Sequence, residues 1–213
     1  MIYYAAKRRM ERETMKTYTI VQKTQDLDWS VVPEAAIDCC QWGYSADVSA
    51  KAQLCYDQDA IYVRLCAREP EIRAEEKGQT GLPYLDSCLE FFLCPMEDSD
   101  TYFNIEMNPN CTMYLGIGSN SQDLIRLLLP DEGNLDAQAQ RTRDGWEITY
   151  RVPVSLIKRF FPEFVIRSGV KMRGNFYKCG DKTKVPHYYA WNPIENEILD
   201  FHQPQWYGQL CLA

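Results

Sequence analysis

The stretch DSCLEFFLCPMEDSDTYFNIEMNPN, residues 86–110, decides the fold class because apolar residues recur at every second position on both sides of a polar turn. Leu89, Phe91 and Leu93 form one such set, and the same alternation returns over residues 101–108. A period of two is typical of a β-strand with one buried face, and the acidic segment between the runs is typical of a turn. We therefore predict paired strands at 87–94 and 101–108.

The opposite face of these two strands would carry polar side chains. If the strands pair, Glu90, Asn104 and Glu106 lie together on that face, with Phe92 and Tyr102 as aromatic neighbours. Carboxylates and amides accept hydrogen bonds from vicinal sugar hydroxyls, and aromatic rings cover the C–H face of a sugar. A solvent-facing sheet face would show the same pattern, and alternation alone favours that simpler interpretation.

The same period continues outward along the chain. It predicts a hairpin of 50–56 with 61–67, and a second hairpin around Asp144-Gly145, the strongest short-range turn signal. Further strands are predicted at 111–116, 169–177, 188–191 and 209–212, and one short helix at 154–160 between Pro153 and Pro162. Many short strands with few helices predict an all-β, antiparallel β-sandwich. We expect a frayed extension over 1–15 and a single domain over 16–213.

Composition narrows the classes of function. The net charge of −7 disfavours partners such as nucleic acid or an anionic membrane surface. The nine cysteines include no C-x-x-C pair, and most lie singly in strand-like runs, as small apolar residues do in a reducing compartment. The first twenty residues lack the apolar core of a signal peptide, and no run approaches the ~20 apolar residues of a membrane span. As written, the chain is expected to be cytoplasmic.

Several motifs occur in a fixed order from Asp47 to Leu212. They are D-S-x-x-E-x-F at 86–92, Y-F-x-x-E-x-N at 102–108, D-G-W at 144–146, W-N-P at 191–193 and P-x-x-Y-G-x-L at 204–210. Each motif is weak alone, but the ordered set is fairly specific. In this order the chain resembles the family 9 carbohydrate-binding modules.

The resemblance implies a β-sandwich of immunoglobulin-like or jelly-roll appearance, of a kind usually attached to extracellular xylanases. Such modules bind the reducing ends of glucans, xylans and small sugars, with the terminal sugar clamped between two aromatic rings. By position in the motifs, the clamp rings would be Tyr84 and Phe201, Glu90 would accept hydroxyl hydrogen bonds, and the family's arginine falls at Asn104. Both clamp positions are tryptophan in the best-known members, so the smaller rings here offer less stacking area.

Other residues extend this predicted site. Arg173 and Asn175 share one strand face, although a charge-satisfied sheet face would look the same. Trp191 could line the pocket or belong to the core, and Trp42 with Tyr44 could form a binding loop or a hydrophobic plug. The predicted ligand-binding set is therefore Tyr84, Glu90, Asn104, Glu106, Arg173, Asn175, Trp191 and Phe201.

No cofactor is required by these motifs. His187 and His202 have no partner at metal-ligand spacing, so a zinc site is not expected. The resemblance leaves a structural calcium ion open, and oxygen ligands occur in predicted loops at Asp98, Asp100, Asp131, Glu132 and Asp136.

The sequence thus favours non-catalytic binding of a saccharide, at the end of a glucan, xylan or short oligosaccharide held between two aromatic rings. Two alternatives stay open. One is a glycoside hydrolase that uses Glu90 and Glu106 as its carboxylate pair. The other is a protein-interaction β-sandwich that has lost its sugar site. The oligomeric state is left open, and the absence of a signal sequence suits a short saccharide better than cellulose.

Overall fold

The structure is a computed structural model, and it describes residues 15–129 and 135–213. Fourteen strands, one α-helix and three short 3₁₀ turns lie within these residues. Residues 1–14 of the predicted N-terminal extension lie outside the described residues, as do Asp131 and Glu132. The all-β fold class with one short helix is confirmed.

The strands run in the following order along the chain. They are β1 Thr17–Gln22, β2 Ala35–Ile37, β3 Cys39–Cys40, β4 Ser49–Tyr56, β5 Ala60–Arg68, β6 Cys88–Cys94, β7 Tyr102–Met107, β8 Met113–Gly118, β9 Ile125–Arg126, β10 Gln138–Arg141, β11 Gly145–Pro153, β12 Lys171–Cys179, β13 Tyr188–Ala190 and β14 Gly208–Leu212. The helix α2 spans Val154–Phe160, and the 3₁₀ turns are η1 Trp29–Val31, η2 Pro83–Leu85 and η3 Pro204–Trp206.

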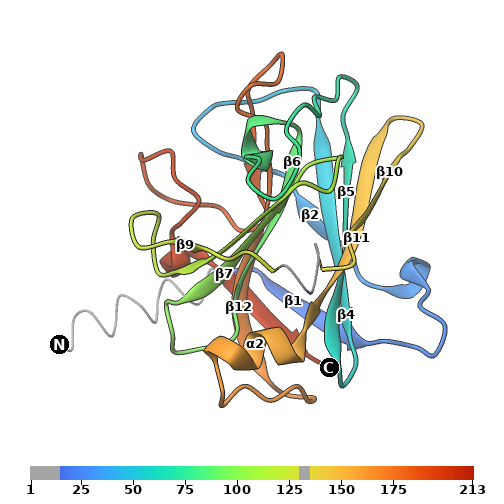
Figure 1. Ribbon diagram of the computed structural model, residues 1–213, viewed down its shortest axis with the longest axis vertical. Helices are drawn as coiled ribbons and strands as arrows, with labels where there is room; N and C mark the ends of the chain where they lie inside the picture. Colours follow the sequence, from blue (N-terminus) through green and yellow to red (C-terminus); the bar gives the residue numbers. More distant parts are fainter. Residues whose placement is uncertain (1–14, 130–134) are drawn as a thin grey trace.

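The strands form one curled sheet with the order β10-β11-β5-β4-β1-β14-β12-β6-β7-β8-β9. Its two halves face each other as the layers of a sandwich, with β4, β5 and β11 in one layer and β6, β7 and β12 in the other (Figure 1). The expectation of a purely antiparallel sheet is wrong at β1, which pairs parallel with both β14 and β4. Parallel neighbours need a long connection, and the chain between β1 and β4 provides one.

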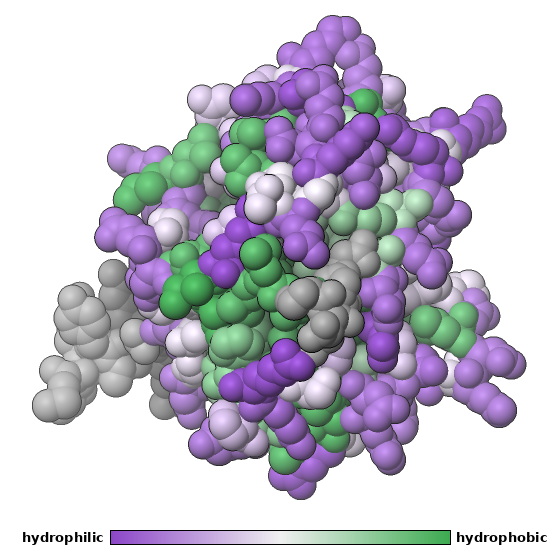
Figure 2. Space-filling view, in the orientation of Figure 1, coloured by the Kyte–Doolittle hydropathy of each residue, from purple (hydrophilic) through white to green (hydrophobic). Residues whose placement is uncertain are grey.

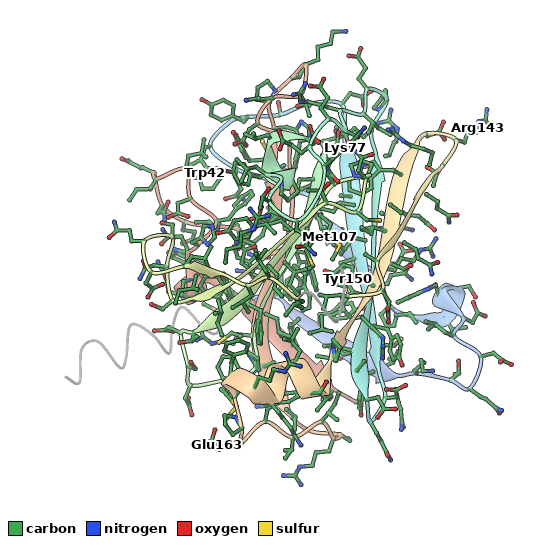
Figure 3. All side chains as sticks on the ribbon, viewed as in Figure 1. Trp42, Lys77, Met107, Arg143, Tyr150 and Glu163 are labelled. Atoms are coloured by element: carbon green, nitrogen blue, oxygen red, sulfur yellow. The ribbon has the colours of Figure 1, made fainter. Side chains whose placement is uncertain are left out.

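The core fills the space between the two layers. Leu89, Phe91 and Leu93 from β6 are fully buried there, opposite apolar residues of β4, β5 and β11. Figure 3 shows Met107 and Tyr150 between the layers, whereas Trp42 lies on the other side of the β6–β7–β12 layer. The predicted alternation is therefore confirmed: one face of β6 and β7 belongs to the core, and the other face is available for the site.

Most element boundaries agree with the predictions. Both predicted hairpins form, and the helix spans the predicted residues 154–160. β8 begins two residues later than predicted because Cys111 has a positive φ of 55° and ends a turn instead of starting a strand. β12 likewise begins after Gly169, whose φ of 82° suits only glycine without strain. The strands β2, β3 and β9 have two or three residues, too few for a period to be recognised.

The surface is mostly polar. Figure 2 shows hydrophilic residues around the rim of the viewed face, with apolar residues gathered towards its middle. Within residues 15–129 and 135–213, no helix is long and apolar enough to cross a membrane.

Candidate functional site

The floor of the candidate site is a row of side chains on the outer face of the β6–β7–β12 layer. The strand register sets Tyr177 opposite Glu90, Glu90 opposite Glu106, and Glu106 opposite Tyr114 on β8. Glu90 is 2% exposed and Glu106 is 5% exposed, and Asn104 is fully buried beside them. The simpler interpretation of this face as a solvated surface is therefore wrong.

Loops cover this floor and enclose a cavity of about 320 Å³. They come from five distant parts of the chain: the turn after β3, the η2 turn, the loop after β8, the loop after β12 and the segment that precedes η3. The lining residues are Trp42, Tyr84, Glu90, Glu106, Tyr114, Ser121, Leu124, Cys179, Asp181, Tyr188, Leu199, Asp200, Phe201 and His202. Alternation in the strands predicted the floor, and the motif positions of Tyr84 and Phe201 predicted two of the covering segments, but no sequence signal indicated the others.

One wall of the cavity consists of stacked aromatic rings. Phe201 lies parallel to Tyr177, with ring centroids 4.1 Å apart, and Trp42 is tilted against Phe201 at 5.4 Å. Tyr188 meets both Trp42 and Phe201 edge-on. The Trp42 indole also donates a hydrogen bond to the carbonyl oxygen of Asn196, which fixes its ring. Each ring is therefore held by its neighbours before any ligand arrives.

The eight predicted ligand-binding residues separate into two groups. Tyr84, Glu90, Glu106 and Phe201 line the cavity together. Asn104 lies just beneath it and donates a hydrogen bond of 2.8 Å from Nδ2 to Glu106 Oε1.

The remaining three predicted residues lie outside the cavity and have structural partners. Arg173 donates to the carbonyl oxygens of Glu97, Ser99 and Pro204 and pairs with Asp100. Asn175 binds the backbone of Asn192 through both of its amide atoms. Trp191 is a core residue packed edge-on against Tyr18 and tilted against Phe176.

Sequence reasoning missed several lining residues. Tyr114, Asp181 and Tyr188 had no motif around them, and only their strand register or loop position brings them to the cavity. For Trp42 the sequence left open a binding loop or a hydrophobic plug, and the structure places this residue in the aromatic wall of the cavity. His202 also lines the cavity, where its Nδ1 lies 2.7 Å from the hydroxyl of Tyr102.

Burial dominates the electrostatics of the two floor carboxyls. Desolvation raises the pKa of Glu106 to about 7, although the hydrogen bond from Asn104 opposes this rise. Desolvation and the neighbouring Cys179 thiol raise the pKa of Glu90 well above its usual value. Burial also raises the pKa of Asp181. These carboxyls therefore keep their protons to a higher pH than exposed carboxyls do, and in the protonated form they can donate as well as accept hydrogen bonds.

The pKa of Glu106 predicts a pH effect on stability. In the unfolded chain this carboxyl ionises near pH 4.5, whereas its pKa in the fold is about 7. The native state keeps the extra proton between these values, so the contribution of Glu106 is full below pH 4.5 and is lost as pH rises towards 7. We expect the wild type to lose about 2–3 kcal/mol more free energy of unfolding across this window than Glu106→Gln, which cannot titrate.

Urea unfolding of both proteins at about pH 4.5 and about pH 8 measures this difference. Comparison with the variant cancels the titration of groups that do not interact with Glu106, His187 included. Parallel pH profiles in the two proteins would show that the Glu106 carboxyl is not held in a desolvated state.

Two thiols adjoin the floor carboxyl Glu90. Cys88 and Cys179 are opposite residues of β6 and β12, and Cys179 Sγ donates to Glu90 Oε1 at 2.9 Å. The ligand atoms of these three residues lie within 4.8 Å of one another, which no other such group of three in the described chain does. Burial raises the pKa of the Cys88 thiol to about 12, and the hydrogen bond with Cys88 together with burial raises the pKa of Cys179 well above its usual value, so neutral thiols are favoured.

The structural calcium expectation gains no support from the described loops. Asp100 pairs with Arg173, and Asp136 pairs with Arg151. Neither they nor Asp98 belong to a group of three ligands within residues 15–129 and 135–213. The thiol-rich set beside Glu90 does not suit calcium, which prefers oxygen ligands.

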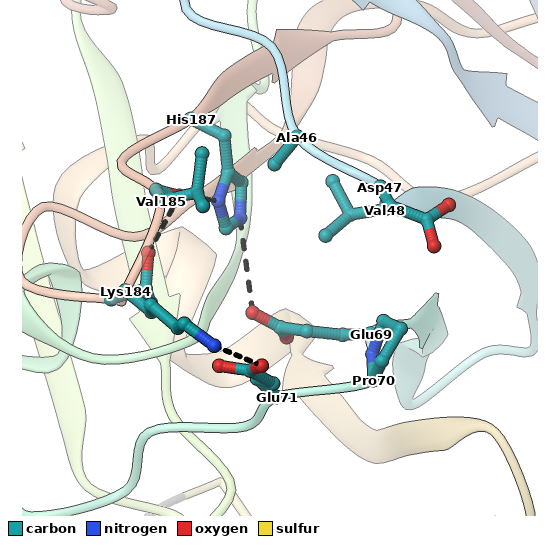
Figure 4. Close-up of a pocket in the computed structure, with 10 residues that line it drawn as sticks. Ala46, Asp47, Val48, Glu69, Pro70, Glu71, Lys184, Val185 and His187 are labelled. Atoms are coloured by element: carbon teal, nitrogen blue, oxygen red, sulfur yellow. Dashed lines mark hydrogen bonds and ion pairs between the residues drawn. The ribbon is translucent and has the colours of Figure 1, made fainter.

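A second hollow of about 220 Å³ lies between the segment before β4, the segment after β5 and the connection from β12 to β13 (Figure 4). Glu69 and His187 form part of its wall, and both belong to a buried network around Lys178. Desolvation and the Lys178 charge lower the pKa of His187 to about 4, so this histidine is neutral and accepts from Lys178 through Nε2. Every polar atom of the network has a partner, which indicates a structural role.

The fold and the cavity together define a β-sandwich with a concave, aromatic and acidic pocket on one sheet face, the form of a carbohydrate-binding module. The chain belongs to carbohydrate-binding family 9, whose family model matches residues 21–212. Among curated proteins, no sequence matches this chain.

Solved structures with similar folds agree with this assignment. A candidate carbohydrate-binding protein from Bacteroides uniformis is 25% identical with a TM-score of 0.81, and the match covers 94% of this chain and 100% of that one. A family 9 module from Caldicellulosiruptor kristjanssonii in complex with glucose is 14% identical with a TM-score of 0.65, covering 93% and 96%. A complex of such a module with cellotriose has a TM-score of 0.62 at 14% identity, covering 93% and 94%.

Proposed function

We propose that this chain is a non-catalytic binding module that receives the end of a glucan, xylan or short oligosaccharide. One observation carries the proposal: a single cavity unites the carboxyl pair Glu90 and Glu106 with the rings of Tyr84 and Phe201. Its volume lies at the small end of the range for ligand pockets, which suits a terminal sugar better than a polymer lying across the sheet. The glucose and cellotriose complexes of structurally similar modules are consistent with this choice.

Two kinds of contact would hold the sugar. The carboxyls of Glu90 and Glu106 on the floor would exchange hydrogen bonds with vicinal hydroxyls, which they can do in their protonated form. Tyr84 and Phe201 would cover the apolar faces of the ring, with Trp42 supporting Phe201. Phe201 is already packed against Tyr177 and Trp42, so little of its side-chain entropy would be lost on binding.

Catalysis is disfavoured by the protonation of the two carboxyls. A glycoside hydrolase needs one carboxyl as acid and a second that stays ionised as nucleophile or base. Here burial raises the pKa of both Glu90 and Glu106, and the charge of Arg126, which does not line the cavity, opposes this rise only in part at Glu106. The pair is therefore suited to hydrogen bonding.

Tyr84→Ala is expected to lower the affinity for the bound saccharide about tenfold, because one stacking ring contributes on the order of 1.5 kcal/mol. Isothermal titration with glucose, cello-oligosaccharides and xylo-oligosaccharides would measure it, with wild-type dissociation constants between micromolar and millimolar. Tyr62→Ala is the matched control, because Tyr62 lies on β5 in the other layer and does not line the cavity.

Three results would overturn the proposal. The first is a panel in which no saccharide binds the wild type, which would favour a protein-interaction role. The second is an equal loss of affinity in the Tyr84 and Tyr62 variants. The third is turnover of aryl-glycosides that disappears in Glu90→Gln or Glu106→Gln, which would make the protein an enzyme.

A further inference from the structure

The charges around the cavity are one-sided. Its lining includes the carboxyl groups of Glu90, Glu106, Asp181 and Asp200 but neither lysine nor arginine. Two of these acids, Glu90 and Glu106, are almost fully buried, so water screens them poorly. A ligand in this cavity is therefore surrounded by acidic side chains, and no lysine or arginine side chain lines the cavity.

Arg126 is the cationic residue that acts on the floor carboxyl Glu106, and its side chain is bound outside the cavity. The charge of Arg126 lowers the pKa of Glu106, but this side chain does not line the cavity. Its guanidinium lies over the ring of Tyr114, 4.5 Å from the centroid, and donates to the backbone carbonyls of Gln79, Thr80, Gly81 and Met113. The guanidinium of Arg126 is therefore bound to the Tyr114 ring and to backbone carbonyls, outside the lining of the cavity.

One of the residues at the floor of the cavity has a buried acceptor atom without a partner. Glu106 is 95% buried, and although its Oε1 accepts from Asn104, its Oε2 has no hydrogen-bond partner. The Oδ1 atom of Asn104, just beneath it, also lacks a partner. A buried acceptor without a hydrogen-bond donor costs free energy. A ligand with an N–H or O–H group near Glu106 Oε2 would remove this cost.

The aromatic walls favour the same kind of donor. The face of an aromatic ring carries negative charge density and attracts a cation within about 6 Å. Tyr84 and Tyr114 both lie close enough to Glu106 for its charge to raise their pKa values, so a group bonded to Glu106 would sit near both rings. An ammonium group bonded to Glu106 would therefore lie near acidic groups and aromatic rings, whereas a hydroxyl would use only the hydrogen bond.

We propose that the cavity prefers a saccharide that carries a protonated amine, such as a 2-amino-2-deoxy-hexose or a short oligomer of it, with the ammonium bound at Glu106 Oε2. This inference rests on the proposed saccharide-binding function and specifies its ligand class. The ammonium would stabilise the ionised form of Glu106, which a neutral sugar would not do. Binding would therefore draw a proton from Glu106, whose pKa of about 7 leaves it partly protonated in the empty site.

Titration with three sugars that differ only at carbon 2 would test the proposal: glucose, glucosamine and N-acetylglucosamine, together with cellobiose and the glucosamine dimer. All titrations contain EDTA, so that no metal ion bridges ligand and protein. Near neutral pH we expect glucosamine to bind about tenfold or more tightly than the two neutral monosaccharides, as a charged hydrogen bond would provide. The heat should also change between buffers of different ionisation enthalpy, because a proton is released.

Glu106→Gln is the decisive variant. It keeps the size of the side chain and an oxygen that can accept from Asn104, but it removes the charge. The preference for glucosamine and the proton release should both disappear, whereas Glu195→Gln, an exposed residue outside the cavity, should keep both. Neutral sugars that bind as tightly as glucosamine would overturn this inference and leave the proposed function standing. A preference that survives in Glu106→Gln would overturn the assignment to Glu106, and no binding by any of the sugars would overturn the proposed function itself.

Discussion

Glu69→Gln is expected to lower the free energy of unfolding by about 3–5 kcal/mol, the typical cost of removing one partner from a buried ion pair. Glu69 Oε1 lies 3.1 Å from Lys178 Nζ, and their side chains are 2% and 0% exposed. The same carboxylate accepts from Ser87 Oγ and Trp146 Nε1. Glutamine keeps the shape but leaves the Lys178 ammonium buried without a counter-charge, since His187 beside it is neutral.

Urea unfolding measures this loss, and the molecule offers a matched control in the same hollow. Lys184 and Glu71 also form an ion pair there, at 2.6 Å, but their side chains are 72% and 60% exposed (Figure 4). Glu71→Gln should therefore change stability by less than about 1 kcal/mol. Adding Lys178→Met to Glu69→Gln should recover part of the loss, because no buried charge then remains. Equal effects of the Glu69 and Glu71 substitutions would contradict this account.

Asn175→Ala is expected to cost about 3 kcal/mol of stability while the folded protein keeps its affinity for saccharide. Asn175 Oδ1 accepts from the backbone N–H groups of Phe176 and Asn192, and its Nδ2 donates to the Asn192 carbonyl. All of these groups are buried, so alanine leaves them without partners, at about 1–3 kcal/mol for each group. The side chain does not line the cavity, which is why binding should persist.

Asn120→Ala provides the comparison. Asn120 Oδ1 also accepts from two backbone N–H groups, of Gln122 and Asp123, but on an exposed loop where water can replace it. Its loss should cost well under 1 kcal/mol. If instead Asn175→Ala unfolds normally but fails to bind sugar, then Asn175 contacts the ligand, as the sequence pattern had predicted.

The fold was predictable because apolar and polar residues alternate wherever one face of a strand is buried. Leu89, Phe91 and Leu93 had to share a face, and burying that face against a second layer required Glu90 to point the other way. The parallel pairing of β1 was not predictable in this way, because alternation says which face a residue occupies but not which strand lies beside it. The shortest strands, β2, β3 and β9, form only because longer neighbours already present their hydrogen-bonding edges.

The site was predictable only in part, for a related reason. Alternation placed Glu90 and Glu106 on one face, and motif spacing pointed to Tyr84 and Phe201, which line the same cavity. The same alternation gave Arg173 and Asn175 as candidates, because they share that sheet face. Whether a polar side chain on a sheet meets a cavity or a covering loop depends on how distant loops pack, and a strand pattern contains no information about that packing.

The position of β14 has a consequence for how the chain reaches its fold. β14 is the last strand in the chain, yet it lies in the middle of the sheet, parallel to β1 and antiparallel to β12, with Thr17 opposite Gln209. The layers cannot be joined at this seam until residues at opposite ends of the chain meet, and such distant contacts make folding slow. Until then, the edges of β1 and β12 stay unpaired and open to other chains. We therefore expect the partly folded protein to be most prone to aggregation just before this strand is added.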